Sequence, residues 1–123
     1  MESNTGPLTP QNFTRENYER IAQIFRAFSD PTRLQLLQAL RKGSRNVGQL
    51  VQELEMNQAN VSKHLQILFD SKILGREKRG TATYYEVNDE FIYPLCKLVC
   101  EKINREESRS QEMVAFEGPD YSI

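Results

Sequence analysis

The fold of this chain is decided by three segments: DPTRLQLLQAL at residues 30–40, MNQANVSKHLQIL at residues 56–68 and GREKRGTATYYEV at residues 75–87. The first segment predicts a helix that begins after Asp30, because an aspartate side chain accepts hydrogen bonds from free backbone amides and Pro31 fits the first helical turn. We expect the buried stripe of this helix to consist of Leu34, Leu37 and Leu40.

Residues 46–68 predict two further helices joined by a tight polar turn. Asn46 and Gln49 form a capping-box-like start for the first of them, and Asn57, which follows Met56 in the turn, begins the second. In the second helix the residues that must face the core, at i, i+4 and i+7, are Val61, Leu65 and Leu68. The residues that lie opposite that stripe or on its shoulders are Ala59, Asn60, Ser62, Lys63, Gln66 and Ile67.

The third segment predicts a two-stranded hairpin, because a tip at Gly80 and Thr81 separates a basic strand from β-favouring residues that end at Val87. Its cations are Arg76, Lys78 and Arg79. A capped helix pair followed by a basic hairpin describes a winged helix-turn-helix, whose second helix can lie in the major groove of DNA. Two alternatives stay open: a merely solvated helix face, and a basic tip that keeps an edge strand from pairing.

We expect one amphipathic helix before the winged helix-turn-helix segment in the sequence and one after it. The first begins near Thr14, and its apolar side consists of Tyr18, Ile21, Phe25 and Phe28. The last begins after Asn88 as its cap, and its apolar stripe consists of Ile92, Cys96, Val99 and Ile103. The predicted fold class is mainly α with a small β-hairpin (α+β), a winged helix-turn-helix with the hairpin between the fourth and fifth helices. We expect a flexible arm over residues 1–13, one domain over residues 14–104 and a flexible tail over residues 105–123.

The composition allows one domain and places basic charge at the centre of the chain. A length of 123 residues with 38% hydrophobic content supplies one modest core. The formal net charge is -1, but residues 26–80 hold ten Lys or Arg against five Asp or Glu. A local field over one face steers a protein to phosphate, so this distribution allows DNA binding. Because no apolar run approaches the roughly eighteen residues of a membrane span, we expect a cytoplasmic protein without membrane contact.

The chain offers little chemistry for an enzyme or a metal site. His64 is the only histidine, and it has no evident acid, base or nucleophile partner, so we expect no enzyme. A single histidine without carboxylates at ligand spacing also argues against a zinc site. The position of His64 beside the core stripe suits a structural residue or one close to DNA.

Three motifs, FSDPTRLQLLQAL, VSKHL and GTATYYEVN, occur in an order that resembles the ArsR/SmtB family of winged-helix repressors. The resemblance implies a homodimer formed through the first and last helices. It also implies that the dimer binds an imperfect inverted repeat of double-stranded DNA and releases it when an inducer binds. The candidates for DNA contact, from the resemblance and the outward helix face together, are Gln58, Ala59, Asn60, Ser62, Lys63, His64, Gln66, Arg76, Lys78, Arg79 and Thr81.

The inducer site is where the chain departs from the family's pattern. The metal site of the third helix needs a cysteine pair, and VGQLVQEL at residues 47–54 has no cysteine, histidine or aspartate. The site across the last helices needs histidines, and residues 88–107 contain none. We therefore expect no metal at the family's usual sites and no required cofactor.

Cys96 and Cys100 leave two readings open. Cysteine frequently packs in interiors, so a role in a dimer interface is one reading. Thiols at i and i+4 also share a helix face, so the other reading is a site for a soft metal or a thiol-reactive inducer. The competing functions are an inducible repressor, a constitutive DNA binder without a ligand, and a winged-helix module that binds other proteins.

Overall fold

The computed structural model describes residues 7, 9–88 and 91–108 of the chain. In chain order its elements are η1 (Pro10–Asn12), α1 (Arg15–Ala27), α2 (Pro31–Leu40), β1 (Arg45–Asn46), α3 (Val47–Leu54), α4 (Gln58–Asp70), β2 (Leu74–Arg79), β3 (Ala82–Val87) and α5 (Ile92–Glu107). This order confirms the predicted winged helix-turn-helix, with the hairpin between the fourth and fifth α-helices.

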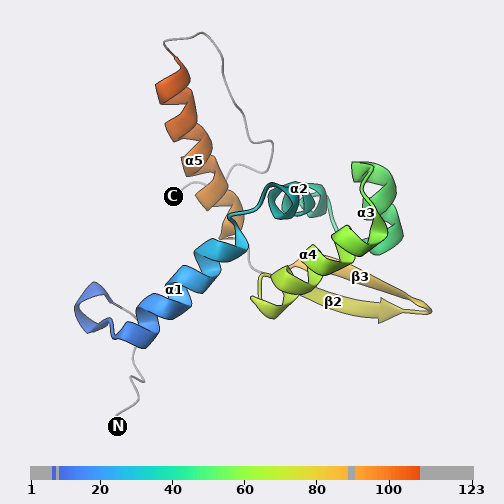
Figure 1. The fold of residues 1–123 in the computed structure, drawn as a ribbon, viewed down its shortest axis with the longest axis horizontal. Helices are drawn as coiled ribbons and strands as arrows, with labels where there is room; N and C mark the ends of the chain where they lie inside the picture. The colour runs from blue at the N-terminus through green and yellow to red at the C-terminus, as the bar shows by residue number, and fades with distance from the viewer. Residues whose placement is uncertain (1–6, 8, 89–90, 109–123) are drawn as a thin grey trace.

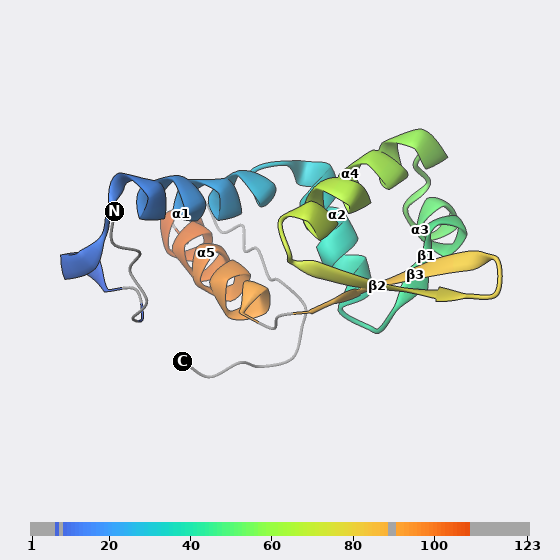
Figure 2. The same ribbon diagram turned by 90° about the horizontal axis from the view of Figure 1, so that it is seen from below.

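The elements divide into a body and two projecting helices (Figure 1). The body consists of α2, α3, α4 and the sheet, and its most extensive helix contacts join α4 to α2 and to α3. Both α1 and α5 extend from the same side of the body, away from α3 and the hairpin tip (Figures 1 and 2). No helix in the described part of the chain is long and apolar enough to cross a membrane.

The sheet has three antiparallel strands in the order β1-β3-β2. The hairpin of β2 and β3 closes with Arg79 opposite Ala82, and Gly80 has a φ of 63° as the first of two turn residues. A positive φ at that position favours glycine, which has no Cβ to clash. The two-residue strand β1 pairs with β3 through Arg45 and Tyr85. It was not predicted, because two residues carry no periodicity.

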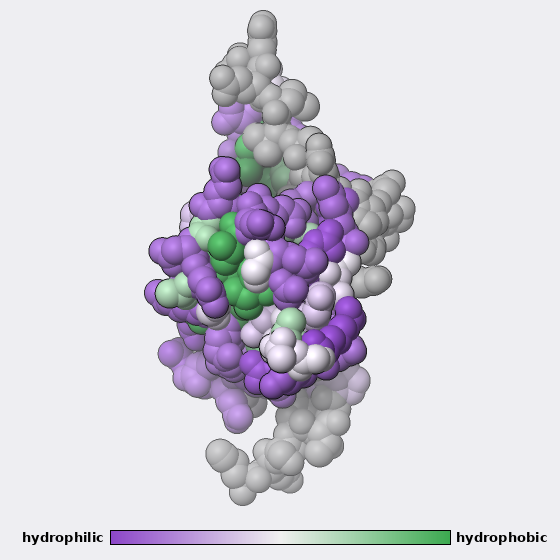
Figure 3. Space-filling model, turned by 90° about the vertical axis from the view of Figure 1, so that its right-hand side faces the viewer, coloured by the Kyte–Doolittle hydropathy of each residue, from purple (hydrophilic) through white to green (hydrophobic). Residues whose placement is uncertain are grey.

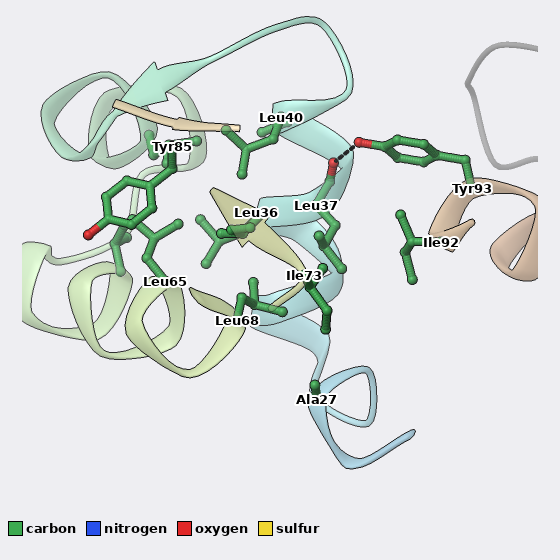
Figure 4. Close-up of a cluster of buried hydrophobic side chains, with 14 residues drawn as sticks. Ala27, Leu36, Leu37, Leu40, Leu65, Leu68, Ile73, Tyr85, Ile92 and Tyr93 are labelled. Carbon is green, nitrogen blue, oxygen red and sulfur yellow. Dashed lines mark hydrogen bonds between the residues drawn. The ribbon is translucent and has the colours of Figure 1, made fainter. Parts of the chain in front are cut away.

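The core lies between α2, α4 and the sheet (Figure 4). The fully buried side chains with the largest volumes are Leu36, Leu37, Leu50, Leu65, Leu68, Ile73, Leu74, Ile92 and Val61. The start of α5 joins this core through Ile92 and through Tyr93, whose hydroxyl donates a 3.0 Å hydrogen bond to the carbonyl of Leu37 (Figure 4). This bond satisfies a buried polar group and ties the beginning of α5 to α2.

The predicted helix starts are confirmed where a polar side chain caps them. Asp30 Oδ1 accepts from the backbone N of Arg33 at 3.1 Å. Asn46 and Gln49 form the reciprocal capping box of α3, and Asn57 caps α4. These caps are local interactions between residues three apart, so they follow from the sequence alone.

The buried stripe predicted for α2 is partly wrong. Leu37 and Leu40 are buried, but Leu34 is 36% exposed and Leu36 is fully buried in its place. Residues two apart lie about 200° apart around a helix, so Leu34 and Leu36 cannot both face the same layer. The core contacts α2 on the side that carries Leu36.

The predicted cap of the last helix is also wrong. The helix α5 begins at Ile92, with Phe91 in the N-cap position and no side-chain cap. Asn88 instead follows directly after β3, and its backbone N–H donates to the carbonyl of Ile73 at 3.0 Å, just beyond the paired strands. Further along α5, Val99 is 49% exposed, because the helix leaves the body after its first turns (Figure 1).

The expected domain limits differ slightly from the elements seen. The stretch expected to be a flexible arm contains the short turn η1, and α5 continues to Glu107, three residues beyond the expected domain end. Residues 109–123 lie outside the described residues, as do residues 1–6 and 8.

Substitution of Asp30 tests whether the charge of the α2 cap stabilises the fold. The backbone hydrogen bond from Arg33 is the main cause that lowers the pKa of Asp30 from its ordinary value. A carboxylate with a lowered folded-state pKa stabilises the protein above its unfolded pKa, and this stabilisation is lost as the pH falls through the folded pKa. We expect Asp30→Ala to lower the free energy of unfolding at pH 7, and Asp30→Asn, which keeps an acceptor, to lower it less.

Urea denaturation at pH 7 and at about pH 3 measures this effect, since an unperturbed aspartate titrates near pH 3.9. The difference between wild type and Asp30→Asn should shrink at the lower pH. A difference that is the same at both pH values would show that the charge of Asp30 does not contribute.

Candidate nucleic-acid interface

The outward side of α4 carries most of the residues predicted for DNA contact. Gln58, Ala59, Lys63 and Gln66 are exposed, and Asn60 and Ser62 are half-buried. The opposite side of the helix is fully buried through Val61, Leu65 and Leu68, as predicted. Since the amide and ammonium groups of such residues can bond base edges and phosphates, this side can bind DNA in a groove.

His64 differs from the other candidates on α4. It is buried, with a side chain only 8% exposed. Its Nδ1 lies 3.0 Å from Nη1 of Arg33, which belongs to α2. Arg33 lies within the predicted helix segment at residues 30–40, but nothing local predicts its contact with a residue 31 positions away.

The hairpin is attached to α4 through Arg76. Its guanidinium lies 3.8 Å from the centre of the Phe69 ring, and Nη1 donates to Oε1 of Gln66 at 3.2 Å. Gln66 in turn donates to Oδ1 of Asp70 at 2.8 Å. A cation–π contact of this kind stabilises by about 0.5–1 kcal/mol at an exposed site. The hairpin of β2 and β3 is called the wing from here on. Its base is therefore held beside the outward face of α4.

Strand alternation divides the wing cations between two faces. Side chains two residues apart lie on the same face of a strand, so Lys78 shares the α4 side with Arg76. Arg79 lies on the other face, where its guanidinium stands 4.5 Å from the Tyr84 ring and its Nε pairs with Glu77 at 3.2 Å. The structure thus gathers Arg76 and Lys78 beside α4 and separates Arg79 from them, while Thr81 is exposed at the tip.

The end of the molecule that carries α3 and the hairpin tip is mainly hydrophilic (Figure 3). Polar side chains surround a small apolar area there. The large exposed hydrophobic side chains of the described residues belong mainly to α1 and α5: Tyr18, Phe25, Leu98 and Val99, with Leu34 of α2 and Phe91 before α5. The polar end and the apolar helices therefore suit different kinds of partner.

The two cysteines of α5 are both half-buried and unpaired. Burial, followed by the effect of the neighbouring Cys100, raises the pKa of the Cys96 thiol. A raised pKa lowers the fraction of thiolate, which is the form that binds soft metals and reacts with electrophiles. Within residues 7, 9–88 and 91–108, no group of three or more histidine, cysteine or acidic side chains could hold a metal ion.

Comparison with known proteins gives a consistent answer for the family. The profile described as "Bacterial regulatory protein, arsR family" matches residues 30–74. An HTH-type transcriptional regulator of Methanocaldococcus jannaschii is 41% identical over 87 residues, which cover 70% of this chain and 98% of the relative. The arsenical resistance operon repressor of Bacillus subtilis is 36% identical over 76 residues, or 61% of this chain and 72% of the repressor. The chain belongs to the ArsR family. It is a transcriptional regulator, which confirms the expectation that it is not an enzyme.

Several solved structures share the fold. The Mycobacterium tuberculosis protein Rv0081 superposes with a TM-score of 0.69 at 22% identity, covering 80% of this chain and all of the other. A homodimeric winged helix-turn-helix DNA-binding domain of Mycobacterium bovis gives a TM-score of 0.65 at 24% identity, with coverage of 87% and 99%. The transcriptional repressor BigR of Xylella fastidiosa gives 0.61 at 26% identity, with coverage of 73% and 96%.

The different settings of Arg76 and Lys78 in this ArsR-family wing predict different effects on stability. Arg76→Ala removes the contact with Phe69 and the hydrogen bond to Gln66, so we expect the free energy of unfolding to fall by about 0.5–1 kcal/mol. Lys78→Ala removes an exposed cation, and we expect a change within about 0.5 kcal/mol. Urea denaturation of both variants measures the difference. Equal losses of unfolding free energy would show that the contacts of Arg76 with α4 do not stabilise the fold.

Proposed function

We propose that this chain is a homodimeric transcriptional repressor that binds an inverted-repeat operator through α4 and the wing of each protomer. One observation carries the proposal: an outward polar face of α4 lies beside a basic wing that Arg76 attaches to the same helix. Such an arrangement supplies base-reading groups and phosphate-binding cations from one surface. The similar proteins of Bacillus subtilis and Xylella fastidiosa are both repressors.

The proposed DNA contacts are divided by role. On α4, Asn60, Lys63 and Gln66 would read base edges, with Gln58, Ala59 and Ser62 close to the DNA backbone. On the wing, Lys78 and Arg76 would contact phosphates on the α4 side, while Arg79 and Thr81 would do so from the tip. A regulator with these contacts would act in the cytoplasm.

The proposed dimer forms through α1 and α5. Tyr18 and Phe25 of α1 are 54% and 57% exposed, and Leu98 and Val99 of α5 are each 49% exposed. Both helices project from the body on one side (Figures 1 and 2). Burial of this apolar surface against a second copy would stabilise the dimer. A two-fold dimer presents two α4 helices, which favours an operator with half-sites about 34–36 Å apart.

The inducer has no assigned site in this proposal. The raised pKa of Cys96 and its packing against the core favour a packing role for that thiol over a sensing role. A soft-metal or thiol-reactive inducer at Cys96 and Cys100 would need a second copy of α5 to complete its ligand set. A repressor without a ligand is the simpler form of the proposal.

Operator choice is tested by substitutions on the outward face of α4. A duplex enriched by the wild-type protein from a random-sequence library serves as the probe, and fluorescence anisotropy measures its affinity against an unselected duplex. We expect Asn60→Ala and Lys63→Ala each to weaken binding to the enriched duplex by about 5–150-fold, which corresponds to about 1–3 kcal/mol per base contact. Lys42→Ala, which removes a cation outside α4 and the wing, is the matched control.

Each outcome of this experiment separates the competing functions. If the α4 variants lose their preference for the enriched duplex over the unselected duplex and Lys42→Ala keeps it, the result supports sequence-specific recognition. If the wild-type protein enriches no duplex, or if all three variants lose affinity equally for both duplexes, the chain is instead a protein-interaction module or a non-specific binder.

Dimerisation is tested by Phe25→Glu. Because Phe25 is already exposed in the single chain, we expect the variant to keep its helix content while its dimer dissociates at least about 30-fold more readily, or about 2 kcal/mol. Gln23→Glu adds the same charge at another exposed position of α1 and should leave the dimer intact. Sedimentation equilibrium measures both, and equal dissociation constants for the two variants would exclude this face of α1 from the interface.

A further inference from the structure

One side chain, Arg33 of α2, joins the end of α1 to the recognition helix α4. Its Nε donates to the carbonyl of Ala27 at 2.8 Å, and its Nη2 donates to the carbonyl of Arg26 at 3.0 Å. Its Nη1 lies 3.0 Å from Nδ1 of His64. The guanidinium therefore contacts two different helices from a third.

The contact fixes the proton position on His64. Arginine carries only donors, so a hydrogen bond in this contact requires Nδ1 of His64 to accept and the imidazole hydrogen to lie on Nε2. Asp30 Oδ1 lies 3.9 Å from the same nitrogen, which is too long for a hydrogen bond. The carboxylate instead accepts from the backbone N of Arg33 and holds the start of α2 in place.

The chemistry of arginine suits this position. The last carbonyls of a helix have no partner within the helix, and the negative end of its dipole favours a cation. The planar guanidinium presents donors in several fixed directions, so one residue can reach two carbonyls and an imidazole nitrogen. A lysine ammonium is a compact point charge and cannot span the same three acceptors.

This link matters because the contacts of α1 with the core lie at its C-terminal end, where Arg33 also binds. Ala27 is buried and Phe28 packs against the core, whereas Tyr18 and Phe25 project from the body. The extensive contacts of α4 are with α2, α3 and β2. Arg33 thus supplies a direct polar connection between α4 and a helix that α4 does not pack against extensively.

We propose that Arg33 and His64 are positioning residues that fix the orientation of α4 relative to α1. The inference rests on the proposed function, in which α1 belongs to the dimer interface and α4 reads DNA. His64 then acts on DNA recognition through Arg33 and not by touching DNA. The pair transmits the angle of the dimer helix to the recognition helix, and its loss lowers operator preference.

The hydrogen bond itself is tested without DNA. His64 is the only histidine of the chain, so the imidazole region of a ¹⁵N-correlated NMR spectrum reports on this residue alone. We expect the Nε2–H tautomer at neutral pH in the full-length protein and a mixture of tautomers in Arg33→Lys. A protonated Nδ1 in the wild-type protein, or an unchanged tautomer in Arg33→Lys, overturns the proposal.

The role in recognition is tested by two substitutions of His64. In His64→Asn the side-chain oxygen occupies about the place of Nδ1, so the acceptor for Arg33 is kept while the Nε2 donor is lost. In His64→Leu the volume is retained but both nitrogens are lost. We expect His64→Leu to lower the ratio of enriched-duplex to random-duplex affinity by about threefold to thirtyfold, and His64→Asn to stay near wild type. Equal losses in both variants would show direct DNA contact and overturn the proposal.

A double-substitution cycle completes the test. Arg33→Lys and His64→Leu remove the two ends of one bond, so the double variant should lose no more operator preference than the worse single variant. Fully additive losses overturn the proposal. If the wild-type protein binds no duplex, the proposed function fails, whereas the NMR measurement still decides whether the Arg33–His64 bond exists.

Discussion

Burial of the inner side of α4 is the constraint on which the rest of the structure depends. Val61, Leu65 and Leu68 have no exposed surface, and full burial of such a side chain contributes about 1.5–3 kcal/mol. A rotation of α4 about its axis would expose them, so the helix has one permitted orientation. Because successive residues advance by 100°, that orientation also determines the outer side, where Lys63 and Gln66 lie. The proposed DNA-facing surface is thus a consequence of the core.

The two projecting helices, α1 and α5, bury a smaller share of their apolar side chains than α4 does. The helix α5 buries Ile92 and Tyr93 and then leaves the body, while α1 keeps Phe25 exposed. A chain of this length supports only a modest core, and beyond Ala27, Ile92 and Tyr93 these helices add little to it. If a second copy covers the exposed apolar side chains of these helices, as proposed, dimerisation stabilises the fold. The stability of the fold then depends on protomer concentration.

The sequence was sufficient wherever structure depends on neighbouring residues. The caps at Asp30, Asn46 and Asn57 involve partners three positions away, and the inner face of α4 follows from helical spacing alone. The choice between Leu34 and Leu36 depends on which layers surround α2, which no local pattern records.

The same limit applies to the candidate site. The outer face of α4 could be predicted, because it is the complement of the core stripe. The strand β1 and the hydrogen bond from Asn88 to Ile73 depend on contacts between segments that are distant in the sequence. The contact of Arg33 with His64 spans 31 positions, and only the folded chain shows that His64 is buried.

The contacts of the wing in the single chain bear on how it would add affinity in the proposed DNA complex. Arg79 pairs with Glu77 at the surface, and an exposed ion pair of this kind contributes at most about 1 kcal/mol, so a phosphate can replace the carboxylate at little cost. Arg76 is held more firmly, but a guanidinium has five N–H donors and uses one of them on Gln66. It can therefore bind a phosphate while it stays attached to α4. Because α4 already orients the wing in the single chain, the proposed DNA binding would cost less conformational entropy than binding by an unattached loop.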